Sequence, residues 1–255
     1  MLLTVDIGNS NIVCGSFKGQ ELAQSLRLKT DPFRTRDEYR ALLLSLWSER
    51  FGQSYEFSKV VISSVVPNLT TVFSTLIGDL FGLKPLIIGP GIKTGLSIRT
   101  SDPAAVGADR VVNAVAAKEF YGVGAIVIDF GTATSFDVID QNSNYLGGVI
   151  APGLEISLDA LVSRTAKLPR IDLVWPERVV GSDTISAMQS GCMIGYVCLV
   201  EGVVERIKTE VVGISNVIAT GGLAHVIAEH TPCINQCSRD LTLHGMRVIA
   251  DMNCL

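Results

Sequence analysis

The sequence predicts an α/β protein with two similar halves, and a repeat and the chain length lead to this fold class. The stretches LLTVDIGNSNIVCGSF and AIVIDFGTATSFDVID share an apolar run, an aspartate, a glycine two positions later, small polar residues and a second apolar run. The two aspartates, Asp6 and Asp129, are 123 residues apart, and the two glycines keep this spacing. A chain of 255 residues can form two domains of about 120 residues, each with its own core. We therefore expect one lobe over residues 1–121 and a second over residues 122–255.

Strands are expected where short apolar or β-branched runs end at turn residues, and helices where apolar residues recur at helical spacing. The predicted strands are residues 2–6, 11–17, 22–30, 59–67, 85–89, 125–130, about 133–139, about 145–151 and 217–220. The predicted helices are residues 37–50, 68–82, 103–120, 184–208 and 223–230. The third helix is expected to begin at Pro103, because Asp102 followed by proline fits an N-cap and the first helical position.

The composition argues against a nucleic-acid-binding or membrane protein. The formal net charge is −4, the pI is about 5.4 and no run of Lys or Arg appears, so a surface for nucleic acid or anionic lipid is unsupported. The most apolar stretch, GCMIGYVCLVEGVVERIK, is interrupted by Glu201 and Glu205, short of the ~18 uninterrupted apolar residues of a membrane span. Residues 1–10 lack the basic region of a signal peptide, so we expect a cytoplasmic protein.

Charged residues make up only 18% of the chain and the mean hydropathy is +0.38, which indicates that apolar surface is covered by another subunit. The segment from Thr184 carries too many apolar residues for one core-facing stripe. These residues are Met188, Cys192, Met193, Tyr196, Val197, Leu199, Val200 and Val203. We therefore predict a homodimer through this helix, and expect charged substitutions at Met193 or Tyr196 to split it.

The cysteines predict reduced thiols rather than disulfides. They occupy positions 14, 192, 198, 233, 237 and 254 without a CxxC pair, a pattern that does not resemble a disulfide framework. His225, His230, Cys233 and Cys237 read H-x4-H-x2-C-x3-C, but zinc sites prefer tighter pairs. We interpret this cluster as a helix end and a loop.

The Asp-x-Gly turns predict a phosphate site. A glycine lets main-chain N–H groups approach a phosphate without an intervening side chain, and Asp6 at the end of a strand can hold magnesium through water. One such turn means little, because many β-hairpins contain one. Two copies in register, with a third glycine turn at Gly221 and Gly222, are a stronger signal.

Five motifs in this order, DIGNSNIVCG, VGADRVVNA, VIDFGTATSFDV, GGVIAPG and IATGGLA, are similar to those of type III pantothenate kinases. That family belongs to the superfamily of acetate and sugar kinases, heat-shock chaperones and actin. The resemblance implies two duplicated actin-like (ribonuclease H-like) lobes with a nucleotide cleft between them. Ser10 and Ser135 stand where the family usually has Thr, which keeps the hydroxyl, and Asp-Pro-Ala-Ala at 102–105 replaces Asn-Pro-x-Glu.

The resemblance implies a kinase (a phosphotransferase with an alcohol acceptor) that makes 4'-phosphopantothenate from pantothenate and ATP, the first step of coenzyme A biosynthesis. The ATP phosphate loop would be formed by Asp6, Ile7, Gly8, Asn9, Ser10, Asn11, Ile12 and Val13, with Thr132 contributing from the second lobe. Pantothenate would be bound by Gly107, Ala108, Asp109, Arg110 and Thr184, and Asp109 would accept the proton of its primary hydroxyl. Asp129 would bind a monovalent cation, K⁺ or NH₄⁺, and Asp6 would hold Mg²⁺ through water.

Simpler interpretations of these residues stay open. Asp109 and Arg110 also fit an exposed ion pair on a helix, Thr184 also fits a helix cap, and Asp129 also fits a carboxylate that only tightens a β-turn. A kinase or phosphatase for another small molecule would keep the same fold, as would a regulator without activity. The GADR segment at 107–110 favours the pantothenate kinase.

Overall fold

The computed structural model describes residues 1–51 and 56–253 and divides into two units, which we describe separately. Unit 1 consists of Met1–Phe120 and Asp240–Leu255, and unit 2 of Tyr121–Arg239. The prediction that residues 122–255 form the second lobe differs from this division at the C-terminal helix. That helix, α7 (Leu241–Met252), contacts β1 and β4 of unit 1, because its buried residues pack on the sheet of that unit.

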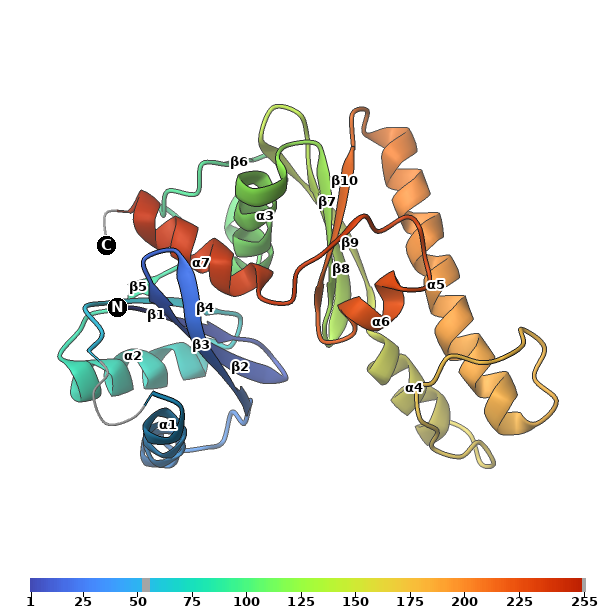
Figure 1. Cartoon of the computed structure of the whole chain (residues 1–255), viewed down its shortest axis with the longest axis horizontal. Coiled ribbons are helices and arrows are strands. Elements are labelled where there is room, and N and C mark those ends of the chain that lie inside the picture. The colour runs from blue at the N-terminus through green and yellow to red at the C-terminus, as the bar shows by residue number, and fades with distance from the viewer. Residues whose placement is uncertain (52–55, 254–255) are drawn as a thin grey trace. The chain divides into compact units, whose positions relative to one another are not determined.

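Unit 1 holds a five-stranded sheet with helices on both faces (Figure 1). Its strands are β1 (Leu2–Ile7), β2 (Asn11–Lys18), β3 (Glu21–Lys29), β4 (Lys59–Ser64) and β5 (Leu86–Ile87). The short β6 (Ser97–Ile98) also belongs to this unit but is not part of this sheet. Its helices are α1 (Arg36–Phe51), α2 (Pro67–Phe81), the 3₁₀ turn η1 (Pro103–Ala105), α3 (Ala108–Tyr121) and α7.

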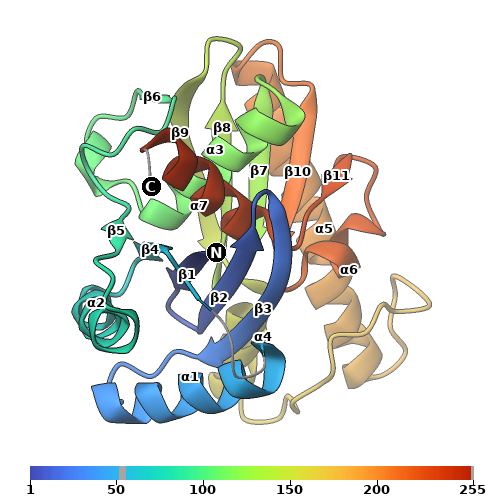
Figure 2. The same ribbon diagram turned by 60° about the vertical axis from the view of Figure 1, so that its left-hand side comes forward.

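Unit 2 has its long helix against one face of its sheet. Its strands are β7 (Ala125–Phe130), β8 (Ala133–Ile139), β9 (Asn144–Pro152), β10 (Asn216–Gly221) and β11 (Gln236–Cys237). Its helices are α4 (Leu154–Ser163), α5 (Thr184–Glu210) and α6 (Ala224–Ala228). Figure 2 shows β11 and α6 beside β10, and both contact that strand.

The two units share one strand topology. The strands of unit 1 lie in the order β3-β2-β1-β4-β5, and those of unit 2 in the order β9-β8-β7-β10-β11. In each unit the first strand is antiparallel to the second and parallel to the fourth. The structure therefore confirms the duplicated α/β fold that the repeated sequence predicts.

The repeated aspartates occupy equivalent places in the two sheets. Asp6 lies opposite Val13 of β2 and Ser63 of β4, one residue before β1 ends. Asp129 lies opposite Ser135 of β8 and Thr220 of β10, one residue before β7 ends. Each glycine turn thus follows the central strand of its own sheet.

The core of unit 1 has two layers. On one face of the sheet, Tyr39 and Trp47 of α1 and Phe73 of α2 pack against strand residues. On the other face, Val112 of α3 and Met246 of α7 are fully buried. The central strand β1 contributes to both layers, with Leu3, Val5 and Ile7 on one face and Leu2 on the other.

The predicted helix over 103–120 is interrupted. Asp102 does act as a cap, accepting a hydrogen bond from the N–H of Ala104 at 3.1 Å, but only for the three-residue η1. Val106 is extended (φ −70°, ψ 125°), so helical geometry stops there and α3 begins at Ala108. The sequence-based assignment also missed α4, α7, β6 and β11, and made α6 too long.

Helix α5 is long and apolar enough to cross a membrane by length and composition, with a mean hydropathy of 1.4 in its best window. A core helix of a soluble protein meets the same criterion, and one side of α5 packs on its own sheet through Val197, Val200 and Val204. This packing on the sheet explains why one side of α5 is apolar.

Candidate active site

The first glycine turn, residues 8–10, is closed by its own backbone. The Gly8 N–H donates to the carbonyl of Asn11 at 3.0 Å, and a Cβ at position 8 would lie 3.1 Å from that oxygen. Asn9 and Ser10 are exposed, whereas Ile7 and Ile12 are fully buried in the core. A phosphate at this turn would therefore meet backbone and short polar groups, which is the donor set it requires.

The predicted catalytic aspartate lies in the first turn of α3. Asp109 is partly buried, and its Oδ1 accepts a hydrogen bond from the N–H of Arg110 at 2.8 Å. Burial raises the pKa of the Asp109 carboxyl above its ordinary value, while the Arg110 N–H and the guanidinium charge act in the opposite direction. Asp109 and Arg110 are both only partly exposed, so the interpretation as an exposed surface ion pair is wrong.

Gly107 and the first turn are connected within unit 1. A Cβ at Gly107 would lie 3.7 Å from Cγ1 of Val65, and the N–H of Val65 donates to the carbonyl of Ile7 at 3.0 Å. The start of α3 therefore lies against the residue that extends the β1–β4 ladder toward Gly8. Two motifs that are a hundred residues apart in the sequence are thus placed in one region of this unit.

The second glycine turn, Gly131–Thr132, brings three motifs of unit 2 together. The Gly222 N–H donates to the carbonyl of Phe130 at 3.1 Å, and the Gly153 N–H donates to the carbonyl of Thr132 at 3.1 Å. Gly221 has φ +94°, and a Cβ there would lie 2.5 Å from Oδ1 of Asp129. The DFGT segment therefore contacts both the APG and the ATGG segments, and Gly221 of the latter lies next to the Asp129 carboxylate.

A buried carboxylate lies two residues beyond Ser135 on β8. Asp137 is fully buried and accepts hydrogen bonds from the Tyr145 hydroxyl at 2.7 Å and the Ser135 hydroxyl at 3.0 Å. Ser135 is also the register partner of Asp129. This network holds the β8–β9 hairpin next to the Asp129 turn.

Thr184 is the first residue of α5 and lies at the surface, but it does not cap the helix. The cap is Asp183, whose carboxylate accepts from the N–H of Ser186 at 3.0 Å in a capping box. That hydrogen bond lowers the pKa of the Asp183 carboxyl. The helix-cap interpretation of Thr184 is therefore wrong.

Thr184 lines a groove of about 740 Å³ between α4 and α5. Apart from Thr184 and a few small residues the lining is apolar, with Leu154, Leu161, Leu168, Met188, Cys192 and Leu199 among its members. The groove lies within unit 2 and is open at the surface of α5.

Met193 and Tyr196, which were expected at a subunit interface, belong to the core of unit 2. Met193 is 1% exposed and Tyr196 is 6% exposed, and the Tyr196 hydroxyl is hydrogen-bonded to that of Thr134 on β8. A charge at either position would disrupt this core, so such a variant would not separate loss of a dimer from loss of the fold. Tyr196 also lines the groove, together with Met188, Cys192 and Leu199 of the same helix, whereas Met193 does not.

The two histidines of the H-x4-H-x2-C-x3-C segment make separate contacts rather than sharing one site. His225 pairs with Glu229 at 3.0 Å, and the ring of His230 stacks on Trp175 with centroids 3.6 Å apart. Within residues 1–51 and 56–253, no three His, Cys, Asp or Glu side chains are close enough together to hold a metal. Five cysteines in these ranges are free thiols, and Cys254 lies outside them.

The structure also identifies residues near the first and second turns that the sequence analysis assigned no role. Thr30 is hydrogen-bonded to the first turn, and Gly153 and Asp137 support the second. Gly153 lies in a motif that had been recognised, so its position offered a signal. Thr30 ends an ordinary strand pattern, and nothing in that pattern marks it.

Comparisons with known proteins agree with this arrangement. The family model for type III pantothenate kinase matches residues 2–206. A type III pantothenate kinase of Moorella thermoacetica is 48% identical over 253 residues, covering 99% of this chain and 100% of the relative. One of Brevibacillus brevis is 50% identical over 254 residues, covering 99% of both chains.

The fold is shared with more distant structures. A Campylobacter jejuni protein, described as a candidate transcriptional activator of the Baf family, superposes with a TM-score of 0.64 at 19% identity, covering 99% of this chain and 98% of that one. At this identity the likeness concerns the fold alone. The match to the family model and the near-complete coverage of relatives at about half identity show that this chain belongs to the type III pantothenate kinase family.

Proposed function

We propose that this chain transfers the γ-phosphoryl group of ATP to the primary hydroxyl of pantothenate, forming 4'-phosphopantothenate and ADP in the first step of coenzyme A biosynthesis. The observation that carries the proposal is the match to type III pantothenate kinases over almost the whole chain. The partly buried carboxylate of Asp109, in the segment where the family resemblance places the catalytic base, supports it.

Asp109 would accept the proton of the pantothenate hydroxyl as the oxygen forms its bond to phosphorus and the bond from phosphorus to the ADP oxygen breaks. Phosphoryl transfer has a loose transition state, so alignment and charge compensation contribute most and the base takes its proton late. Gly107, Ala108 and Arg110 would surround the acceptor alcohol. The hydrogen bond from the Arg110 N–H to Oδ1 holds the Asp109 carboxylate in one orientation.

The turn at Asp6–Val13 would hold the ATP phosphates through backbone N–H groups and the side chains of Asn9 and Ser10, with Thr132 as a further donor. The exposed polar residues at 9 and 10 and the missing side chain at Gly8 fit a phosphate. Bound Mg²⁺, held through water by Asp6, would offset phosphate charge during transfer.

Asp129 would hold a monovalent cation, potassium or ammonium. Asp129 precedes the second glycine turn, Ser135 is its register partner, and the Phe130 carbonyl lies in the same turn. Oxygen atoms are the ligands such an ion requires. The cation would offset repulsion between this carboxylate and two anionic substrates.

The groove between α4 and α5 would be covered by a second copy of the chain, giving a cytoplasmic homodimer. Its apolar lining and the low charged fraction of 18% support an interface, because interface cores are depleted in charged residues. The family resemblance assigns Thr184, which lines this groove, to pantothenate binding.

The decisive experiment incubates purified protein with ATP, magnesium and potassium, together with pantothenate or a panel of other alcohols, and detects the product by mass. Phosphopantothenate is expected. No phosphopantothenate, with another alcohol phosphorylated, would assign the chain a different kinase activity.

A further inference from the structure

The backbone of the first glycine turn is tied to the end of β3 by one residue, Thr30. The Thr30 N–H donates to the carbonyl of Ser10 at 3.0 Å, and the Thr30 hydroxyl donates to the carbonyl of Gly8 at 2.7 Å. Thr30 is only 8% exposed, so these bonds are shielded from water. The carbonyls on both sides of Asn9 are therefore held by a single side chain and its own backbone.

The residue after Thr30 is held in turn by helix α1. The Asp31 N–H donates to the Tyr39 hydroxyl at 2.9 Å, and that hydroxyl donates to the Asp31 carbonyl at 2.9 Å. Tyr39 is fully buried, with its ring 5.0 Å from that of Phe73. Tyr39 thus links the Thr30–Asp31 segment to the rigid core of unit 1.

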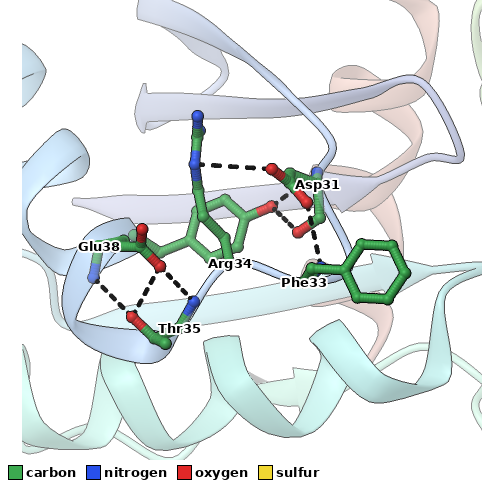
Figure 3. A network of polar contacts seen from close by, with 6 residues as sticks. Asp31, Phe33, Arg34, Thr35 and Glu38 are labelled. Carbon is green, nitrogen blue, oxygen red and sulfur yellow. Dashed lines mark hydrogen bonds and ion pairs between the residues drawn. The ribbon is translucent and has the colours of Figure 1, made fainter.

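The loop that follows is also closed by local contacts (Figure 3). Oδ1 of Asp31 accepts from the Phe33 N–H at 3.1 Å, and the guanidinium of Arg34 lies 4.0 Å from the other carboxylate oxygen. Oε2 of Glu38 accepts from the N–H of Thr35 at 2.7 Å, and the Glu38 N–H donates back to the Thr35 hydroxyl at 3.3 Å. The segment from Thr30 to α1 therefore has a defined conformation.

Holding the Gly8 carbonyl determines where the next N–H points. The C=O of Gly8 and the N–H of Asn9 belong to one planar peptide unit, so the Thr30 hydroxyl fixes the direction of the Asn9 N–H. A phosphate that binds to backbone N–H groups gains affinity when they are oriented beforehand, because no ordering is then required on binding.

We propose that Thr30 is a positioning residue for the phosphates of the nucleotide, with Tyr39 as its support. This inference rests on the proposed function of the Asp6–Val13 turn. It assigns to the end of β3 a part in nucleotide affinity that does not involve contact with the acceptor alcohol.

The test is the Thr30→Val variant, which keeps the shape and the N–H of residue 30 but removes the hydroxyl. One hydrogen bond contributes about 1 kcal/mol, so the Kd for ADP from calorimetry should rise about 3- to 10-fold. The KM for ATP should rise by a similar factor, and the KM for pantothenate should change less than about twofold. Thr30→Ser, which restores the hydroxyl, should bind ADP within about twofold of wild type.

The matched control is Thr75→Val in α2, which removes an exposed hydroxyl that also donates to a carbonyl, that of Thr71 at 3.0 Å. It should leave the Kd for ADP unchanged. Should Thr30→Val fail to fold, Tyr39→Phe takes its place, because it keeps the buried ring and removes both bonds to Asp31. A Kd for ADP equal to that of wild type in the folded variant would overturn the inference.

ADP titration requires no pantothenate, so its outcome is separate from the acceptor assignment. If the wild-type protein phosphorylates a different alcohol but binds ADP, this test remains valid. Wild type that fails to bind ADP would refute the nucleotide role of the Asp6–Val13 turn and this inference with it. If wild type binds ADP normally and Thr30→Val binds ADP with the same Kd, this inference alone is refuted.

Discussion

The carboxylate of Asp109 occupies the space next to Gly107 that a side chain at position 107 would need. A Cβ built on Gly107 would lie 2.6 Å from Oδ1 of Asp109, well inside van der Waals contact. The backbone of Gly107 is not among the glycines with positive φ, so the glycine is explained by this close approach rather than by its dihedral angles.

We therefore expect Gly107→Ala to fold normally and to lose turnover. The clash is with the end of a flexible side chain, so the carboxylate would rotate away at little cost in stability. A displacement of about 1 Å in a reacting group can cost about 10²-fold in rate, so kcat should fall between about 10-fold and 100-fold. The control is Gly78→Ala on an exposed part of α2, where a Cβ finds nothing closer than 3.9 Å. Normal kcat in Gly107→Ala would show that the Asp109 orientation does not matter.

Asp109→Asn should remove most of the turnover without affecting the fold. Asn keeps the shape and an acceptor for the Arg110 N–H but cannot accept the proton, and general-base contributions are typically ~10²- to 10⁴-fold. Asp102→Asn is the matched control, because residue 102 is exposed and Asn also caps helices. Turnover in Asp109→Asn within about threefold of wild type would exclude Asp109 as the base.

The same variant should be at least as stable as wild type at neutral pH. Burial raises the folded-state pKa of Asp109 above its ordinary 3.8, so folding favours the protonated carboxyl and the charged form reduces the free energy of unfolding. Above the folded-state pKa this cost is fully present, and it disappears as the pH falls through that pKa. Thermal melting of both proteins should show Asp109→Asn with the higher melting temperature at neutral pH and a smaller difference in acid. The reverse order at neutral pH would contradict the effect of burial.

Potassium and ammonium should raise turnover strongly, and sodium only weakly, because sodium is costlier to dehydrate. Initial rates in potassium, ammonium, sodium and choline chlorides at matched ionic strength test this, with Asp129→Ala alongside wild type. Loss of the potassium effect in Asp129→Ala would support a cation at this turn. Equal wild-type rates in all four salts would leave Asp129 with the role of tightening the β-turn.

Leu161→Glu should separate the dimer while each protomer stays folded. Leu161 lines the α4–α5 groove and is 39% exposed in the single chain, so a carboxylate there is tolerated by the protomer but not in a covered apolar interface. Light scattering should give twice the chain mass of 27.3 kDa for wild type and the chain mass for the variant. Val212→Glu, at an 88% exposed position outside the groove, should stay dimeric. Wild type at the chain mass would contradict the dimer.

The sequence by itself was sufficient for the duplicated fold and for the family. The Asp-x-Gly turns could be recognised because a short strand, a glycine and a second strand are determined by neighbouring residues, and the repeat at 123 residues placed the two turns in equivalent sheets. The similarity of the GADR segment to the family motif predicted Asp109 as the base. Both signals are local, and local patterns depend on propensities that the chain carries without its tertiary contacts.

Only the tertiary structure decided which surface each amphipathic element covers. The periodicity of α5 marks Met193 and Leu199 alike as apolar, but Met193 packs on the sheet of unit 2 while Leu199 lines the groove. Likewise α7 packs with unit 1 although it follows unit 2 in the chain, and the Thr30 hydroxyl bonds to Gly8, 22 residues earlier. Which surface an element covers depends on contacts between residues far apart in sequence. Those contacts form only when the strands and helices have been brought together.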